Sequence, residues 1–183
     1  MKRFFDFLFS FVMLIILSPI FLVVSLILMF DGGPVLYKQV RVGRGGKEFK
    51  IFKFRSMVVN ADKIGGYSTQ VSDPRITKIG KILRKTSIDE LPQLLNVLEG
   101  SMSIVGPRPN VPEQRADYTK HDWDLRNSVK PGITGLAQAK IRSAATAEER
   151  LKLDLEYIKK AGFCFDLWIL LLTFKQVIFR GGY

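Results

Sequence analysis

Asp89 and Glu90 stand side by side in a strongly basic stretch of the chain, shortly after Arg84. Adjacent carboxylates can supply a nucleophile, a general base or ligands for a divalent cation. A plainer interpretation is also open, because Ser87 and Glu90 have the spacing of a helix capping box. If Asp89 is the N-cap, Pro92 takes the third helical position, where its missing N–H costs nothing. The helix dipole would then favour Asp89 as an anion.

Basic side chains that could face a phosphate lie on both sides of this pair. Lys53 and Arg55 come at the end of an expected strand, and Arg108 stands between two prolines in Gly106-Pro107-Arg108-Pro109. An arginine fork suits bidentate phosphate binding, and rigid flanks reduce the entropy lost on binding. A rigid loop with an exposed arginine is the plainer alternative. Pro131-Gly132 likewise predicts a type II turn, with lining of a ligand site as the alternative.

Composition restricts the class of partner and of chemistry. The chain has 183 residues with 47% apolar content and a formal net charge of +11, which predicts one domain plus an appendage and an anionic partner. The partner could be a nucleic acid, an anionic membrane surface or a phosphorylated small molecule. Cys164 is the only cysteine, so an intrachain disulfide is excluded and a reducing compartment is expected. His121 is the only histidine, which disfavours a histidine-based zinc site or a Ser-His-Asp triad and leaves at most one histidine as a general base.

The segment 4–30 is almost wholly apolar. As one straight helix it would be about 40 Å long, against about 30 Å of bilayer hydrocarbon, so it could span with tilt. Pro19 should kink the helix near its middle, and Ser18 can bond a carbonyl that the kink frees. Basic residues flank both ends, and both flanks therefore prefer the cytoplasmic side. A re-entrant hairpin satisfies both flanks, while a kinked span remains the alternative. No small-residue cleavage site follows, so we expect no removable signal peptide.

The rest of the chain predicts a series of short elements. Gly45-Gly46 should turn a hairpin between strands 35–42 and 48–54, and Asp73-Pro74 should start a helix as N-cap and first helical residue. The basic face of that helix predicts either contact with anionic lipid or a solvated helix packed on the core. The segment 163–174 predicts an interfacial helix or a buried core helix. The other expected elements are a helix within 56–63, a loop at 65–69, a helix at 91–98 ended by Gly100, a strand at 103–105 and a helix at 147–160.

In this order the motifs resemble the bacterial sugar transferase family, the monotopic phosphoglycosyl transferases. The resemblance covers nearly the whole chain, and the ordered set is specific although each piece is weak alone. The residues that carry it are Ser18-Pro19, Lys53-Phe54-Arg55-Ser56-Met57, Asp73-Pro74-Arg75-Ile76-Thr77, Leu83-Arg84, Asp89-Glu90-Leu91-Pro92-Gln93, Gly106-Pro107-Arg108-Pro109 and Pro131-Gly132-Ile133-Thr134-Gly135.

The resemblance implies a reaction and its site. A sugar 1-phosphate moves from a UDP-sugar to polyprenyl phosphate, UMP is released, and Asp89 is the nucleophile that forms an acyl-phosphate. Mg²⁺ offsets the pyrophosphate charge, with Asp89 and Glu90 as its ligands. Glu90 could instead deprotonate an acceptor or orient Asp89, and these roles stay open. The phosphate-screening residues would be Lys53, Arg55, Arg84 and Arg108, and the substrate-lining residues Pro107, Pro109, Pro131, Gly132 and Thr134.

The expected fold is α/β and mainly helical, in two parts. Residues 1–31 would form a re-entrant membrane hairpin that breaks at Ser18-Pro19. Residues 32–183 would form a cytoplasmic catalytic domain with a short β-hairpin and interfacial amphipathic helices. The resemblance implies one leaflet of the bacterial inner (cytoplasmic) membrane, with the active site on the cytoplasmic face.

Two other classes of function remain as rivals. A non-enzymatic module could bind anionic lipid through its basic helix and apolar ends, with salt-sensitive binding that ignores Asp89. A nucleic-acid binder is indicated only by charge, because the aromatic residues gather in the apolar termini rather than among the basic residues. We therefore expect no nucleic-acid partner.

Overall fold

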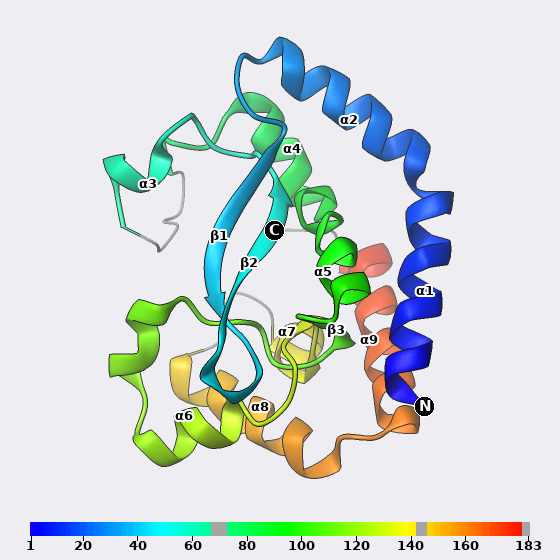
Figure 1. The fold of residues 1–183 in the computed structure, drawn as a ribbon, viewed down its shortest axis with the longest axis vertical. Coiled ribbons are helices and arrows are strands. Elements are labelled where there is room, and N and C mark those ends of the chain that lie inside the picture. Colours follow the sequence, from blue (N-terminus) through cyan, green and yellow to red (C-terminus); the bar gives the residue numbers. More distant parts are fainter. Residues whose placement is uncertain (67–72, 142–145, 181–183) are drawn as a thin grey trace.

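The computed structural model describes residues 1–66, 73–141 and 146–180, in which helices predominate and two small two-stranded sheets occur (Figure 1). The helices are α1 (Lys2–Ile16), α2 (Ser18–Phe30), α3 (Ala61–Ile64), α4 (Lys78–Lys85), α5 (Gln93–Glu99), α6 (Lys120–Arg126), α7 (Leu136–Ile141), α8 (Ala147–Lys160) and α9 (Phe163–Arg180). The strands are β1 (Leu36–Val42), β2 (Glu48–Phe54), β3 (Ser103–Val105) and β4 (Gly132–Thr134). The mainly helical α/β class expected from the sequence is confirmed at this level.

The β1–β2 hairpin forms as predicted. The two strands pair antiparallel along their whole lengths. Gly45 and Gly46 turn the chain with φ values of 69° and 75°, a region that other residues enter only with strain. Ile51 and Phe54 of β2 are both buried, Ile51 in the main core and Phe54 in a second cluster with α2 and α4. Because they are three residues apart they lie on opposite faces of the strand, so both faces of β2 pack against protein.

The predicted break in the N-terminal apolar segment is confirmed. α1 and α2 meet at a bend of 62°, with Pro19 in the first turn of α2. Pro19 has no N–H to give to the carbonyl of Ile15, and the Ser18 hydroxyl donates to that oxygen instead at 2.8 Å. Among the described residues no single helix is long and apolar enough to cross a bilayer, whereas α1 and α2 together reach that length and composition as a bent pair.

α1 is attached to the rest of the molecule by polar contacts at its first two turns. The Arg3 guanidinium donates to the carbonyls of Val97 and Leu98 at the end of α5. The buried Asp6 carboxylate accepts from the Ser103 hydroxyl at 2.9 Å and from the Ile104 N–H at 3.2 Å. These contacts explain why an acidic residue interrupts an otherwise apolar helix.

Lys2 completes this attachment by linking α1 to the two C-terminal helices. Its ammonium pairs with Asp166 of α9 and lies 3.4 Å from the hydroxyl of Tyr157 on α8. That hydroxyl donates to Asp166 at 2.9 Å. We call Lys2, Asp6, Tyr157 and Asp166 the anchor cluster.

α2 contacts the same body at its far end. Val24 and Leu28 are buried against Phe54 of β2 and Leu83 of α4. The bent pair therefore starts and finishes on one body of protein, as Figure 1 shows for the blue segment. Its outer face exposes a continuous series of apolar side chains: Phe4, Phe7, Leu8, Phe11, Val12, Ile15, Ile16, Ile20, Leu22, Val23, Leu26, Ile27, Met29 and Phe30.

The main core lies where β2, α5 and the short parallel pair β3–β4 meet the C-terminal helices. Its central members include Val97, Met102, Leu136, Tyr157 and Ile169, each no more than 2% exposed. Because β3 and β4 belong to this core, the loops that follow them are held against a rigid base.

Two helix predictions were wrong for one shared reason. Residues 56–58 and 75–77 pair with each other, through a Met57–Ile76 bridge and a Val58 N–H that donates to the Arg75 carbonyl at 2.8 Å. The pairing leaves only Ala61–Ile64 of the expected 56–63 helix. The helix expected at Asp73-Pro74 begins at Lys78, where Thr77 is the N-cap, because the Asp73 carboxylate binds the guanidinium of Arg75. The predicted loop at 65–69 lies mostly outside the described residues.

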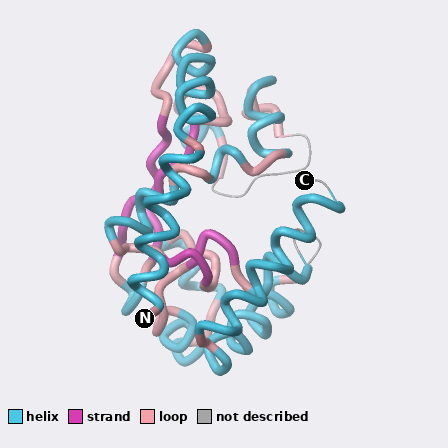
Figure 2. The backbone as a smooth tube through the Cα atoms, turned by 90° about the vertical axis from the view of Figure 1, so that its right-hand side faces the viewer, coloured by secondary structure: helices cyan, strands magenta, loops and turns pink. Residues whose placement is uncertain are grey.

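Other short elements were predicted well. α5 ends at Gly100 with φ of 92°, β3 covers Ser103–Val105, and α8 covers Ala147–Lys160. α9 extends beyond the predicted 163–174 segment and has two different faces. Ile169 is fully buried, while Leu171 and Phe174 are 69% and 67% exposed. Figure 2 shows α9 diverging from the N-terminal pair.

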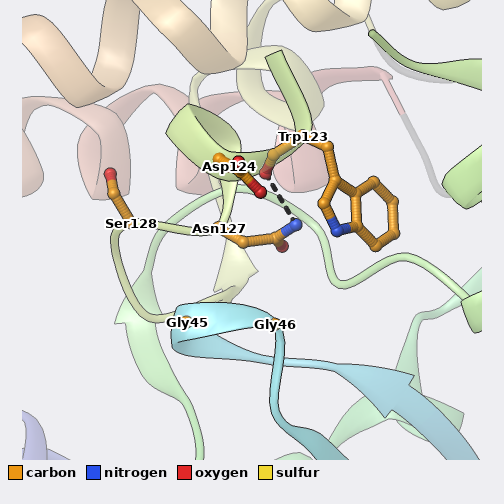
Figure 3. A pocket seen from close by; sticks show the side chains of 6 residues that line it. All are labelled: Gly45, Gly46, Trp123, Asp124, Asn127 and Ser128. Atoms are coloured by element: carbon orange, nitrogen blue, oxygen red, sulfur yellow. Dashed lines mark hydrogen bonds between the residues drawn. The ribbon is translucent and has the colours of Figure 1, made fainter. Parts of the chain in front are cut away.

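A hollow of about 260 Å³ lies between the β1–β2 turn and α6 (Figure 3). In it, the Asn127 side chain donates to the Trp123 carbonyl at 2.8 Å. None of the predicted site residues lines this hollow. Its lining residues are Gly45, Gly46, Trp123, Asp124, Asn127 and Ser128.

Candidate active site

Four separate elements contribute the residues of the candidate site. Lys53 comes from β2, Arg84 from the last turn of α4, and Arg108 from the loop after β3. Asp89 and Glu90 lie in a short 3-10 helix, Ile88–Glu90, that packs against both β2 and α4. We call these five residues the carboxylate site.

The capping interpretations of the acidic pair were both wrong. Asp89 lies inside the 3-10 helix rather than at a helix start, and Pro92 is the N-cap of α5. Ser87 has φ of 58° and its side chain caps nothing. The Glu90 side chain is held by cations from other elements, so it cannot reach back to Ser87.

Glu90 is clamped by two cations. Its Oε1 receives the Lys53 ammonium at 2.7 Å and the Arg108 Nη2 at 2.8 Å. Burial alone would raise the pKa of Glu90, but Arg108 and Lys53 together hold that pKa well below its ordinary value. Glu90 is therefore an anion at neutral pH and a very weak base.

The pKa of Lys53 is also lowered, but for a lysine this disfavours the charged form. Burial lowers the pKa of Lys53 and the ion pair with Glu90 raises it, with a net lowering. The neighbouring Arg108 adds to the lowering. Glu90 therefore favours the charged form of Lys53 and opposes the effect of burial on its pKa.

Asp89 has a different environment from its neighbour. It is 6% exposed, and no hydrogen bond or ion pair reaches its carboxylate from residues 1–66, 73–141 or 146–180. Burial raises the pKa of Asp89 to about 6, and the charge of Glu90 adds to this, while Lys53, Arg84 and Arg108 oppose it. The expectation that a helix dipole stabilises this anion was wrong, because burial dominates.

The structure brings together three of the four predicted cations. Lys53 and Arg108 bind Glu90, and Arg84 lowers the pKa of Asp89 by its charge while its Nε donates to the Ser56 hydroxyl at 2.9 Å. Arg55 lies apart from them. Its guanidinium donates to the Leu28 carbonyl at 3.0 Å and pairs with Asp31 at 3.1 Å, so it holds the end of α2.

The segments around Gly106-Pro107 and Pro131-Gly132 lie against each other. The predicted type II turn at Pro131-Gly132 was wrong, because Gly132 begins β4 and does not have the positive φ that such a turn requires. The Gly132 N–H donates to the Pro107 carbonyl at 2.9 Å, and a Cβ on Gly132 would lie 2.1 Å from the Gly106 nitrogen. Pro107, Pro109 and Pro131 are buried. The Thr134 hydroxyl is hydrogen-bonded to Thr173 at 2.8 Å. The loops thus form a frame that carries Arg108, and their role in lining a substrate remains a prediction.

The remaining predicted residues, Ser18 and Pro19, lie at the bend between α1 and α2 and are not part of the carboxylate site. His121, the only possible histidine base, is exposed at the start of α6. Neither position supplies a group to the acidic pair.

The donor set fits a magnesium ion only in part. Among the described residues no group of three acidic, histidine or cysteine side chains could hold a metal. Mg²⁺ at phosphate-transfer sites is commonly held by one or two carboxylates together with water and substrate phosphates. Asp89 is a suitable ligand of this kind, whereas both Glu90 oxygens are engaged by cations.

Sequence reasoning missed the residues that hold Arg108 in place. Arg126 of α6 and Asp154 of α8 form an ion pair at 2.9 Å, and each side chain is 5% exposed. Arg126 also donates to the Arg108 carbonyl at 2.6 Å. No sequence signal marks this pair, because its members are 28 residues apart and charged residues at such positions are ordinarily solvated.

Comparisons with known proteins identify the family of the chain. A family model described as "Bacterial sugar transferase" matches residues 1–180. The chain is 42% identical over 193 residues to the UDP-glucose:undecaprenyl-phosphate glucose-1-phosphate transferase of Escherichia coli, with 100% of this chain and 41% of that protein covered. It is 40% identical over 186 residues to the UDP-N-acetylgalactosamine-undecaprenyl-phosphate N-acetylgalactosaminephosphotransferase of Aeromonas hydrophila, with 96% and 42% covered.

A third relative has nearly the same length. The uncharacterized sugar transferase EpsL of Bacillus subtilis is 42% identical over 183 residues, with 100% of this chain and 89% of that protein covered. The chain spans about two fifths of the length of the two relatives from Escherichia coli and Aeromonas hydrophila. Since the family model extends over almost every residue, the chain belongs to the bacterial sugar transferase family.

Proposed function

We propose that this chain transfers a sugar 1-phosphate from a UDP-sugar to polyprenyl phosphate and releases UMP. The observation that carries the proposal is the Asp89 carboxylate, which is buried beside three cations yet bonded to none of the described residues. A carboxylate in that state is desolvated and available for attack on phosphorus. The names of the Escherichia coli and Aeromonas hydrophila relatives supply the donor and acceptor classes.

The first displacement forms a covalent intermediate. An Asp89 oxygen attacks the β-phosphorus of the UDP-sugar, and the bond from that phosphorus to the oxygen bridging the α-phosphate breaks. UMP leaves with the bridging oxygen, and the sugar phosphate remains on Asp89 as an acyl-phosphate. An attacking anion is repelled by the pyrophosphate, so the charges of Lys53, Arg84 and Arg108 lower the barrier by screening that repulsion.

The second displacement regenerates the enzyme. A phosphate oxygen of polyprenyl phosphate attacks the same phosphorus, and the bond from that phosphorus to the Asp89 oxygen breaks. The product is a polyprenyl diphosphate sugar, and Asp89 returns as a carboxylate. A fully ionised polyprenyl phosphate has no proton that a base must remove. The step therefore does not need Glu90 to act as a base.

Glu90 acts in this scheme as the holder of Lys53 and Arg108. It bonds both cations at once, and its charge raises the pKa of Lys53 against the effect of burial. Mg²⁺ bound to Asp89 and the substrate phosphates would supply further neutralisation of the pyrophosphate. Glu90 does not act as a base in this scheme.

We also propose that residues 1–31 form a re-entrant hairpin in one leaflet of the cytoplasmic membrane, with residues 32–183 as the catalytic domain on the cytoplasmic face. The 62° bend supports this, as does the attachment of both ends of the bent pair to one body through Arg3 and Leu28. The exposed apolar outer face of α1 and α2 would contact lipid.

The chemical proposal is tested by a burst experiment. The purified full chain in detergent with Mg²⁺ is mixed with a panel of UDP-sugars without acceptor, and UMP is measured. With the correct donor we expect at most one UMP per enzyme and a mass increase equal to one sugar phosphate. Asp89→Asn should give neither, while Glu99→Gln, which changes an exposed acid on α5, should behave as wild type. UMP release by Asp89→Asn at the wild-type rate would exclude the nucleophile.

The membrane topology is tested by cysteine labelling in the Cys164→Ser background. One cysteine is placed in an N-terminal tag, and the other is Lys47→Cys in the exposed β1–β2 turn. A re-entrant hairpin predicts that a membrane-impermeant reagent labels both from the cytoplasmic side. Labelling of the two cysteines from opposite sides would show a full span and contradict the hairpin.

A further inference from the structure

The loop that carries Arg108 is held by an unusual series of contacts to its carbonyl groups. Four successive carbonyls, from Pro107 to Asn110, each accept a hydrogen bond from another element. The donors are the Gly132 N–H to Pro107 at 2.9 Å, Arg126 Nη2 to Arg108 at 2.6 Å, Arg41 Nη1 to Pro109 at 3.0 Å and the Val42 N–H to Asn110 at 2.9 Å.

This arrangement follows from the composition of the loop. Pro107 and Pro109 have no N–H, so these two residues cannot donate to a neighbouring strand. Its position must be set through its acceptors. The result is a backbone that is buried at both prolines and an Arg108 side chain that is 44% exposed.

Among the four donors, Arg126 is the one whose burial is hardest to expect from the sequence. Its side chain is 5% exposed, its Nε donates to Asp154 and its Nη2 donates to the Arg108 carbonyl. It also lies over the ring of Tyr118, with 5.8 Å between the guanidinium carbon and the ring centre. Burying two charges costs more than an apolar pair would, so packing alone gives no reason for this choice.

A guanidinium is suited to this task because its donors form a rigid planar fork. The bond from Nε to the Asp154 carboxylate orients the group, and Nη2 then donates to a single backbone oxygen. A lysine ammonium has no such fixed plane, so it would bind one of the two acceptors more readily than both at once.

We propose that Arg126, oriented by Asp154, is a positioning residue that sets where the Arg108 guanidinium meets Glu90 and the donor phosphate. Arg126 itself does not contact Glu90 or Asp89 and acts through the Arg108 backbone. Arg108 connects this loop to the carboxylate site, because its Nη2 lies 2.8 Å from the same Glu90 oxygen that Lys53 binds. This inference rests on the proposed function for its readout.

The test is a double-mutant cycle on the rate of UMP release at low UDP-sugar concentration. Arg126→Met with Asp154→Leu removes both buried charges together, which avoids leaving one unpaired. We expect kcat/KM to fall about ten- to hundredfold, the size expected when a group near the reacting atoms is displaced by about 1 Å. In the Arg108→Ala background the same two substitutions should change kcat/KM less than about threefold, since residues acting as a unit are not additive.

Arg84→Ala supplies the matched control background. Arg84 belongs to the same site but is carried by α4, so removal of Arg126 and Asp154 should there cause the full loss seen in wild type. If the loss is equal with and without Arg108, or if no loss occurs, the inference is overturned. If instead the wild type releases no UMP from any donor, the proposed function has failed rather than this inference.

A second variant covers the case in which the Met–Leu protein does not fold. Arg126→Lys keeps a cation beside Asp154 and loses the fork, so it should fold and show a smaller loss that again disappears with Arg108→Ala. A thermal unfolding midpoint close to that of wild type, together with this loss, supports positioning. Full activity of Arg126→Lys with Arg108 present would contradict it.

Discussion

Asp6 and Asp89 are both almost fully buried, at 3% and 6% exposure, but they differ in what surrounds their carboxylates. Asp6 belongs to the anchor cluster, where a hydroxyl and a backbone N–H each bind one of its oxygens. Asp89 belongs to the carboxylate site, has neighbouring cations and no bond from any described residue. A buried anion with satisfied oxygens stabilises a fold, whereas one without partners costs stability and is available for chemistry.

The same contrast extends to the cations of the two clusters. Lys2 joins α1 to α8 and α9 through Asp166 and Tyr157, and this contact attaches the N-terminal pair. Lys53 and Arg108 converge on Glu90 beside Asp89, whose carboxylate none of the described residues bonds. In the anchor cluster the charged groups bind other groups of the protein. In the carboxylate site the cations leave a net positive field that can attract a diphosphate.

The largest effect is expected from Asp89→Ala. Loss of the nucleophile should lower turnover by about 10⁴-fold or more, as for other residues that form covalent intermediates. The unfolding midpoint should stay unchanged or rise, because the substitution removes a buried carboxylate without a partner. The pair of measurements is steady-state UMP release and thermal unfolding in detergent. A strong loss of stability would remove the distinction between the two aspartates.

Asp6→Ala should have the reverse outcome. It leaves the Ser103 hydroxyl and the Ile104 N–H without their buried acceptor, which should cost about 2–3 kcal/mol of unfolding free energy. Turnover per folded molecule should remain near that of wild type. Denaturant titration of the full chain in detergent, with activity normalised to the folded fraction, measures both. A large loss of turnover in the folded protein would show that the anchor cluster also serves the reaction.

The pH dependence of the first displacement tests the state of Asp89. Burial raises its pKa to about 6, and only the deprotonated form can attack. The rate should be level above that pH and fall about tenfold per unit below it. Stability should change in the other direction: the folded state binds the proton more tightly than the unfolded chain, so wild type should gain stability relative to Asp89→Asn as pH falls from about 7 to about 4. A rate that is flat down to pH 4 would contradict the raised pKa.

The smallest effect is expected from Tyr157→Phe. The hydroxyl donates to Asp166 at 2.9 Å and lies 3.0 Å from the Val105 carbonyl, and its loss should cost about 1 kcal/mol of unfolding free energy. Activity should be unaffected because no reacting group is touched. Thermal unfolding and UMP release are again the two measurements. A change in activity without a change in stability would place this tyrosine in the function of the carboxylate site.

Local signals in the sequence were reliable where one short-range interaction decides the backbone. The Gly45-Gly46 turn needs positive φ at both residues, and Ser18-Pro19 breaks a helix through a missing N–H. Both elements form as predicted. Asp73-Pro74 has an equally clear local signal, but the Asp73 carboxylate binds Arg75 and the segment pairs with residues 56–58, so a longer-range contact overrides the cap.

The candidate site shows the same division. Lys53 and Arg55 are two residues apart and were expected to face one phosphate. The structure separates them, because the Arg55 guanidinium binds the Leu28 carbonyl and Asp31 at the end of α2. Arg126 and Asp154 gave no signal at all, because nothing local distinguishes a buried charge from a solvated one.

The acidic pair, the broken apolar segment, the hairpin and the two proline-rich segments can be recognised in the sequence, because each depends on residues adjacent in the chain. The tertiary arrangement settles which carboxylate is held by cations and which is bonded by none of the described residues. That choice depends on where β2, α4 and the loop after β3 place Lys53, Arg84 and Arg108 around Asp89 and Glu90. Electrostatic interactions in a buried site depend on distance and solvent exposure, and neither is set by spacing along the chain.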